Sequence, residues 1–149
     1  MKLSIACDHG GYNYKVKLIE HLKQAGHEVI DFGCPSLDSC DYPDFALPAA
    51  EAVKDGVVDF GILICSTGIG ISIAANKVKG IRCAHCHDVK SAMLTRNHNN
   101  ANMIAFGAMI ISEELMYEIV NTFLASTFDG GRHERRVNKI SDIEAKYSK

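Results

Sequence analysis

The sequence predicts a three-layer α/β/α domain, Rossmann-like in architecture, with a parallel β-sheet at its centre. Short, almost continuously apolar segments alternate along the chain with longer segments in which apolar residues recur at helical spacing. Parallel strands of this kind are joined by right-handed crossovers, so we expect helices on both faces of the sheet. With 149 residues, 47% of them hydrophobic, the chain is long enough for one sizeable core and short for two, so one domain spanning 1–149 is expected.

Each predicted strand is a short apolar segment, and a helix follows each strand. We expect strands at residues 3–7, 28–32, 57–65, 81–85 and 102–106, and helices at 12–25, 45–54, 71–77, 89–98 and 113–124. Gly26 supplies the stop of the first helix, and Gly33 closes the second strand. Pro48 must lie in the first turn of its helix or bend it, because proline has no amide hydrogen to donate. Residues 130–149 lie beyond this alternation and are polar and charged.

The composition excludes several classes of protein. A net charge of −2 gives no general electrostatic surface for nucleic acid. No apolar stretch approaches about 18 residues, so we expect neither a membrane-spanning helix nor a cleaved signal peptide. The six cysteines lie mainly in or beside apolar segments: Cys7, Cys34, Cys40, Cys65, Cys83 and Cys86. This placement favours reduced thiols in a cytoplasmic protein over a disulfide scaffold.

The most informative segment runs from Ile62 to Gly70, where an apolar strand ends in Cys65 and a glycine-containing loop opens the next helix. Such a loop presents backbone amides and the positive end of a helix dipole, which favour a bound anion and also favour thiolate over thiol. Thr67 adds a hydroxyl. The alternative is a buried structural cysteine, which is the usual role of this residue type.

Three other segments carry polar side chains suited to a site. Asp8-His9-Gly10-Gly11 follows the first strand and allows close approach of a ligand, although Asp8 can equally cap a helix. His98 to Asn102 offers an imidazole and three amides, although asparagine is ordinary at helix ends. Arg132 and Arg136 are four residues apart and suit a phosphate monoester, or else belong to a solvated basic tail.

Two further patterns suggest cofactors that we do not expect. The glycines lack the G-x-G-x-x-G spacing of a dinucleotide site. The segment Cys83-Ala84-His85-Cys86-His87 has no second ligand pair at zinc-finger distance, and on a strand Cys86 would point away from the others, so no metal is expected. Ligands of parallel α/β folds bind beyond the carboxyl ends of the strands. We therefore expect Asp8-His9, Cys65–Thr67 and the segment after the fourth helix to meet at that edge.

Five motifs, in this order and spacing, resemble the type B ribose-5-phosphate isomerases, a family that also includes the subunits of galactose-6-phosphate isomerase. They are Asp8-His9-Gly10-Gly11, Asp41-Tyr42-Pro43-Asp44, Cys65 to Gly70, His98 to Asn102, and Gly131 to Arg136. The resemblance covers residues 2 to about 140 and implies a five-stranded parallel sheet of order 2-1-3-5-4. It implies an aldose–ketose isomerase of the pentose phosphate pathway that interconverts ribose 5-phosphate and ribulose 5-phosphate without metal or cofactor.

The resemblance also implies a role for each matching residue. Cys65 would move a proton between C1 and C2, His98 would open the furanose ring with help from Thr67, and Asp8 would hold sugar hydroxyls. The phosphate would be bound by His9, Arg132 and Arg136 across a dimer interface. Residues 130–149 would then pack on or reach to a partner subunit of a homodimer or homotetramer. The other expected substrate-binding residues are Tyr42, Ser66, Gly68, Ile69, Gly70, Ile71 and Asn99.

Two positions depart from the family pattern. Many members carry Gly where this chain has Ser66, and Arg where it has Met109. The second departure predicts a weaker dependence on the phosphate, and the first can alter the preferred sugar. A hexose 6-phosphate isomerase of the allose or galactose type, and a non-catalytic sugar-phosphate sensor on the same fold, are the alternatives.

Overall fold

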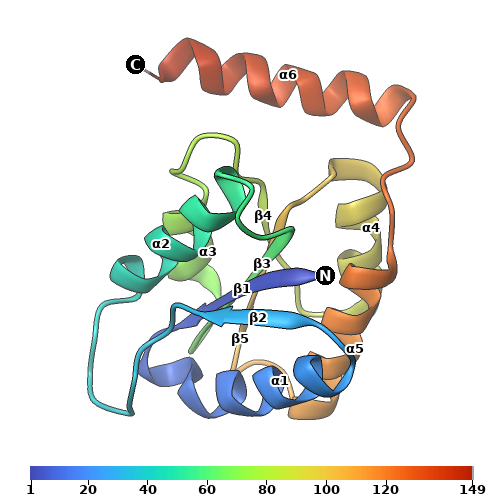
Figure 1. Cartoon of the computed structure of the whole chain (residues 1–149). Coiled ribbons are helices and arrows are strands. Elements are labelled where there is room, and N and C mark those ends of the chain that lie inside the picture. Colours follow the sequence, from blue (N-terminus) through green and yellow to red (C-terminus); the bar gives the residue numbers. More distant parts are fainter. Residues whose placement is uncertain (149) are drawn as a thin grey trace.

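A five-stranded, all-parallel sheet in the order β2-β1-β3-β5-β4 forms the centre of the molecule, as predicted (Figure 1). The computed structural model describes residues 1–148. The strands are β1 Lys2–Cys7, β2 Glu28–Asp31, β3 Phe60–Cys65, β4 Cys83–His85 and β5 Met103–Gly107. The helices are the short 3₁₀ helix η1 His9–Gly11, α1 Tyr12–Gln24, α2 Tyr42–Lys54, α3 Ile69–Ala75, α4 Val89–Asn99, α5 Glu113–Ala125 and α6 Arg132–Tyr147.

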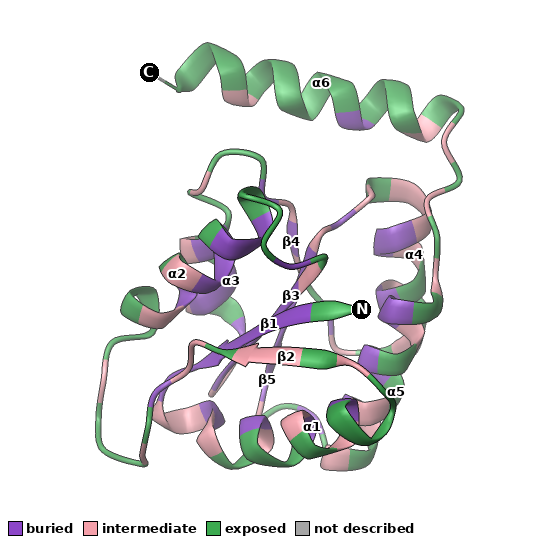
Figure 2. Cartoon of the chain, viewed as in Figure 1, coloured by how far each residue is buried: buried purple, intermediate pink, exposed green. Residues whose placement is uncertain are grey.

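The two faces of the sheet carry separate cores, because successive strand residues point to opposite sides. Leu3, Ile5 and Ile62 pack with α1 and α5 on one face. Ala6 and Leu63 pack with α2 and α3 on the other. Buried residues follow the central strands and the inner sides of these helices (Figure 2). The expected three-layer arrangement is therefore confirmed.

Several element boundaries differ from those predicted. The third strand begins at Phe60 rather than Val57, because Gly56 adopts a left-handed conformation (φ +73°). The chain then folds back, and the amides of Val57 and Val58 both donate to the carbonyl of Ala52, at 2.9 and 3.2 Å. The fourth strand is similarly shorter than expected, and α3 begins at Ile69, two residues before the predicted start.

Helix α2 contains Pro48 in its interior rather than in its first turn, which Pro43 occupies instead. Pro48 has no amide hydrogen to donate to the carbonyl of Asp44, so this helix lacks one bond of its ladder. The helix retains strong support from packing, because Ala46, Ala49 and Ala50 are fully buried against the sheet.

The C-terminal segment forms a 16-residue helix, α6, that the sequence alone did not predict. It lies across one end of the molecule, outside the three layers, and contacts α4 (Figure 1). Its one buried residue is Val137, whereas Ile140, Ile143 and Tyr147 are exposed. No helix in residues 1–148 combines the length and apolar character needed to cross a bilayer.

Candidate active site

The loop after β3 holds a thiol against a backbone amide. Cys65 ends β3 and is buried, and the amide of Gly68 donates to its Sγ at 3.0 Å. Gly68 has a φ of +79°, a conformation that glycine adopts without strain, and it forms the N-cap of α3. The amide of Ile69 donates to Oγ1 of Thr67 at 3.2 Å. The thiol therefore lies beside the N-terminus of a helix, as the sequence predicted.

The carbonyls of this loop are anchored, whereas most of its amides are not. The carbonyl of Cys65 accepts from Ala108, and that of Ser66 from Met109, both at 2.9 Å. The carbonyl of Thr67 lies 2.8 Å from Nε2 of His85. Within residues 1–148, no acceptor is bonded to the amides of Ser66, Thr67, Gly70 and Ile71. These free donors can hold an oxyanion.

The turn after β1 packs directly on this loop. A Cβ added to Gly10 would lie 2.2 Å from Oγ of Ser66, and one added to Gly11 would lie 2.5 Å from the carbonyl oxygen of Ile64. Oδ1 of the buried Asp8 accepts from the amide of Gly10 at 2.9 Å, so Asp8 caps η1. This is the helix-capping role that the sequence suggested as the alternative to ligand binding. Capping uses one carboxylate oxygen and leaves the other for a ligand.

His9 and Tyr42 complete this edge of the sheet. The amide of Cys40 donates to Nδ1 of His9 at 3.3 Å, so the neutral ring carries its proton on Nε2. The ring of Tyr42, the first residue of α2, lies against Gly70, where an added Cβ would be 2.5 Å from Cζ. We call Asp8, His9, Tyr42 and residues 65–71 the carboxyl-edge cluster.

Four other thiols are less acidic than an ordinary cysteine. Burial raises the pKa of Cys7, with a further contribution from the neighbouring Cys34. Burial also raises the pKa of Cys40, Cys83 and Cys86. These thiols therefore stay protonated near neutral pH and behave as small apolar side chains.

A second group of predicted residues gathers where α4 and α6 meet. The imidazoles of His98 and His133 stack with centroids 4.1 Å apart, and Arg132 and Arg136 lie in the first two turns of α6. Burial lowers the pKa of His133, and the neighbouring His98, Arg132 and Arg136 lower it further. We call His98, Asn99, Arg132 and Arg136 the amino-edge cluster.

Asn100 and Asn102 have structural roles, and the helix-end explanation holds for Asn100. Asn100 is the C-cap of α4, with a φ of +47°, and its Oδ1 accepts from Nη1 of Arg96 at 2.9 Å. Oδ1 of Asn102 accepts from the amide of Arg82 at 2.8 Å. Asn99 is left as the asparagine of this segment that can meet a ligand.

The two clusters lie at opposite edges of the sheet, which corrects the expectation that His98 joins Cys65 within one chain. Helix α4 runs antiparallel to the strands, so its end returns to their amino ends. Accordingly Nη2 of Arg82, just before β4, donates to the carbonyl of Asn100 at 2.8 Å, and the amide of Asn102 donates to the carbonyl of Arg82 at 3.1 Å. A five-residue strand such as β5 separates the two edges by about 16 Å.

Two histidine-rich groups do not have the geometry of a metal site. Ligand atoms of His98, Asp129 and His133 lie within 4.8 Å of one another, but the two rings are inclined by only 9°. Imidazole lone pairs lie in the ring plane, so those of stacked rings do not converge on one ion. In the other group, β4 ends at His85, whose Nε2 is bonded to Thr67, and His87 lies beyond the strand.

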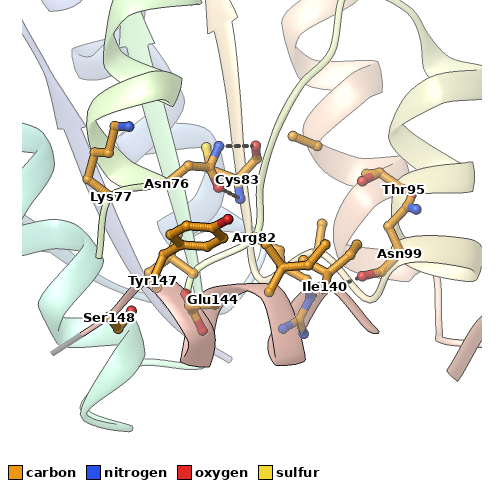
Figure 3. A pocket seen from close by; sticks show the side chains of 14 residues that line it. Asn76, Lys77, Arg82, Cys83, Thr95, Asn99, Ile140, Glu144, Tyr147 and Ser148 are labelled. Atoms are coloured by element: carbon orange, nitrogen blue, oxygen red, sulfur yellow. Dashed lines mark hydrogen bonds between the residues drawn. The ribbon is translucent and has the colours of Figure 1, made fainter. Parts of the chain in front are cut away.

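A groove of about 650 Å³ separates α6 from the amino edge of the sheet (Figure 3). Arg82 and Asn99 line one side, and Ile140 and Tyr147 line the other. The side chain of Asn76 spans its floor through two bonds with the backbone of Cys83, at 2.8 and 2.9 Å. The groove is distinct from the carboxyl-edge cluster and lies beside the amino-edge cluster.

Sequence reasoning did not select His85, Cys40 or His133 as parts of a site. His85 and Cys40 reach the carboxyl-edge cluster from segments 18 and 31 residues away, through contacts with Thr67 and His9. A motif does not reveal such contacts. The position of His133 next to Arg132, within a segment already expected to bind phosphate, was the one available signal.

Comparisons with known proteins place these features in a family. The family model described as Ribose/Galactose Isomerase matches residues 3–140. The chain is 48% identical over 143 residues to ribose-5-phosphate isomerase B of Escherichia coli (strain K12), with 96% of each chain covered.

Solved structures agree with this match. A structure of ribose-5-phosphate isomerase B from Clostridium thermocellum superimposes with a TM-score of 0.98 at 54% identity, covering 99% of this chain and 100% of that one. A structure of the Mycoplasma genitalium enzyme with bound ribulose-5-phosphate gives a TM-score of 0.93 at 42% identity, covering 99% and 97%. This chain therefore belongs to the ribose/galactose isomerase family.

Proposed function

We infer that the chain is an aldose–ketose isomerase that interconverts ribose 5-phosphate and ribulose 5-phosphate. Its relatives named ribose-5-phosphate isomerase B span nearly its whole length, and one of them holds ribulose-5-phosphate. The structural observation that carries the inference is the Cys65 thiol beside a loop with four amides that have no acceptor in the described part of the chain, residues 1–148. A base next to a ready oxyanion site is what proton transfer beside a carbonyl requires.

The reaction begins with the open-chain aldose, whose C1 carbonyl oxygen lies against the free amides. The Cys65 thiolate removes the proton from C2, the C1–C2 double bond forms, and the C1 oxygen takes the negative charge. Each preorganised amide donor stabilises this enediolate by about 3 kcal/mol. Cys65 then returns the proton to C1, while the C2 hydroxyl loses its proton to the C1 oxygen and becomes the ketone. No electron leaves the substrate, so the residues complete the reaction without a redox partner.

The remaining carboxyl-edge residues would bind the sugar. Asp8 uses Oδ1 to cap η1, so its other carboxylate oxygen can accept from a sugar hydroxyl. Nε2–H of His9 can donate to a phosphate oxygen, because Nδ1 already accepts from the amide of Cys40. The ring of Tyr42 against Gly70 would close one side of the pocket.

We propose that the amino-edge cluster acts on a substrate held by another copy of the chain. About 16 Å of sheet separates His98 from Cys65 within one chain, which exceeds the length of a pentose phosphate. In a two-fold dimer each partner supplies one edge to each site, so both sites are completed together. His98 would then open the ring, Asn99 would bind the sugar, and Arg132 and Arg136 would bind its phosphate.

Helix α6 supports this assembly. Ile140, Ile143 and Tyr147 lie on one side of the helix at helical spacing, and all three are exposed in the single chain. An apolar stripe beside a groove of about 650 Å³ suits the surface of a second copy, because monomers seldom leave such stripes open.

The free thiols, including Cys7 and Cys34 with Sγ atoms 3.7 Å apart, fit a reducing cytoplasmic compartment.

The test is turnover of ribose 5-phosphate by the purified chain in the presence of EDTA. Cys65→Ala is expected to lower kcat at least a hundredfold, the effect of losing a general base. Cys83→Ala, which removes a buried thiol outside the cluster, is the matched control and is expected to retain activity. Equal activity of Cys65→Ala and wild type would refute the assignment of the base. Turnover of hexose 6-phosphates but not of ribose 5-phosphate would identify a hexose phosphate isomerase. Binding of sugar phosphates without any turnover would identify a non-catalytic sensor.

A further inference from the structure

We propose that His85 is a positioning residue of the isomerase, which aims the amide of Gly68 at the thiol of Cys65. Nε2 of His85 lies 2.8 Å from the carbonyl oxygen of Thr67, and the amide of Gly68 lies 3.0 Å from Sγ of Cys65. The inference rests on the proposed role of Cys65 as the base. It adds a residue that takes no part in binding the sugar or moving its proton.

The argument begins with the geometry of one peptide group. The carbonyl of Thr67 and the amide of Gly68 belong to the same planar unit, and every peptide bond in residues 1–148 is trans. In a trans peptide the C=O and N–H bonds point in opposite directions. A donor that holds the carbonyl on one side therefore directs the N–H to the other side, where Cys65 lies.

His85 is the one partner of this carbonyl within residues 1–148. A carbonyl oxygen only accepts hydrogen bonds, so Nε2 of His85 must carry a proton. This is true of the neutral Nε2–H tautomer and of the charged ring alike. The contact is therefore compatible with both the neutral and the charged imidazole.

Both histidine and peptide are held in place by their surroundings. The ring of His87 packs edge-on against that of His85, with centroids 4.3 Å apart and an interplanar angle of 80°. On the other side of the loop, a Cβ added to Gly107 would lie within 2.6 Å of three backbone atoms of Thr67. A Cβ at Gly68 would lie 2.8 Å from Nε2 of His85. The peptide is thus packed between β5 and the end of β4.

The consequence concerns the ionised form of Cys65. An N–H aimed at sulfur stabilises the thiolate that removes the proton. Because this N–H already points at Sγ, it does not have to reorient during the reaction. Without His85 the peptide loses one of its two restraints, and its amide is less closely directed at Sγ. The sugar and phosphate contacts remain unchanged. The loss should therefore fall on kcat and leave KM nearly constant.

Three substitutions test this role. His85→Phe keeps a ring beside His87 but has no donor, and His85→Ala removes both. His85→Gln places a side-chain N–H at about the reach of Nε2. We expect His85→Phe and His85→Ala to lower kcat roughly three- to tenfold, the effect of one hydrogen bond. His85→Gln should recover most of the rate, and KM should change less than about twofold in all three.

A second readout separates positioning from general stability. Alkylation of Cys65 by iodoacetamide at a fixed pH, followed by peptide mass spectrometry, should slow in His85→Phe and recover in His85→Gln. Wild-type kcat and alkylation in His85→Phe would overturn the proposal. So would equal losses in His85→Phe and His85→Gln, because packing would then be the cause. An active Cys65→Ala variant would instead refute the proposed base, which separates the two failures.

Discussion

The imidazole rings of His98 and His133 stack in parallel, with centroids 4.1 Å apart and planes inclined by 9°. This contact joins the end of α4 to the first turn of α6. Arg132 and Arg136 lie in the first two turns of α6, beside this contact. The proposed ring-opening residue therefore lies beside two proposed phosphate-binding residues, and the amide of Asp129 adds a second link by donating to the carbonyl of Asn97 at 3.0 Å.

This stacking makes stability dependent on pH. Burial, and the charges of His98, Arg132 and Arg136, hold the pKa of His133 below its ordinary value of about 6.5. The unfolded chain then binds more protons than the folded chain as the pH falls below about 6.5, so folding becomes less favourable in that range. Urea unfolding between about pH 7 and pH 5 should show a falling free energy of unfolding, with a shallower slope in His133→Asn.

His27 provides the control for this prediction. Its pKa is also lowered, by burial first and then by the charged N-terminus, so His27→Asn should flatten the same curve independently. Additive effects of the two substitutions are expected, because the residues lie in separate parts of the chain. A His133→Asn curve that parallels wild type would contradict the role of the stacked pair.

Mixing two inactive variants should restore activity if the sites are shared. Cys65→Ala damages the carboxyl-edge cluster, and Arg132→Ala/Arg136→Ala damages the amino-edge cluster. In a mixed dimer one site combines both damaged edges and the other combines two intact ones. Equal mixing and reassembly should therefore recover about one quarter of the wild-type activity. Turnover of the mixture no higher than that of either variant would show that each site is built from one chain.

Two glycine substitutions should differ in their effects, because Gly11→Ala should mainly lower stability and Gly70→Ala should mainly weaken substrate binding. Gly11→Ala places a Cβ 2.5 Å from the backbone oxygen of Ile64, which cannot move aside, so a loss of about 2 kcal/mol in the free energy of unfolding is expected. Gly70→Ala meets the ring of Tyr42, a side chain that can turn into solvent. It should cost less than about 1 kcal/mol.

The matching prediction for Gly70→Ala concerns the substrate. Displacing Tyr42 opens one side of the pocket, so KM for ribose 5-phosphate should rise several-fold while thermal unfolding changes little. Tyr42→Ala should raise KM by a similar factor, and adding Gly70→Ala to it should have little further effect. Independent, multiplying effects would mean that Tyr42 does not mediate the change.

Met109 offers a test of phosphate dependence. It is 79% exposed, and its amide donates to the carbonyl of Ser66, so its side chain starts beside the Cys65 loop. Met109→Arg should lower KM for ribose 5-phosphate roughly tenfold by adding a charge-assisted contact, with no change for ribose. The wild-type chain should turn over some unphosphorylated sugar, and complete loss of turnover without phosphate would contradict this expectation.

Local signals in the sequence were sufficient for the strands and helices of the α/β/α body and for the Cys65 loop. Strands such as β3 and β5 are buried on both faces and are therefore almost entirely apolar, so their composition alone distinguishes them from the helices and loops. The loop was found because Cys65 ends a strand and Gly68 begins a helix. Helix α6 was missed because it is mostly polar and packs on the body chiefly through Val137.

Relationships across the sheet were not accessible in the same way. The placement of His98 depends on the direction of α4, and the motif His98 to Asn102 says nothing of which edge it reaches. The contact between His85 and Thr67 depends on the order of β3, β5 and β4, which the family resemblance supplied and periodicity did not. Sequence patterns describe neighbours along a chain, whereas these sites are made by neighbours across strands.

The distance between the carboxyl-edge and amino-edge clusters has a consequence for the history of such a protein. After duplication of its gene, one copy can lose Cys65 and the other can lose the arginine pair, and a mixed form of the proposed dimer still keeps one complete site. Each gene then becomes indispensable to the other, although neither product works alone. An enzyme encoded once can in this way become an obligate pair of unequal subunits through loss alone, with no new residue gained.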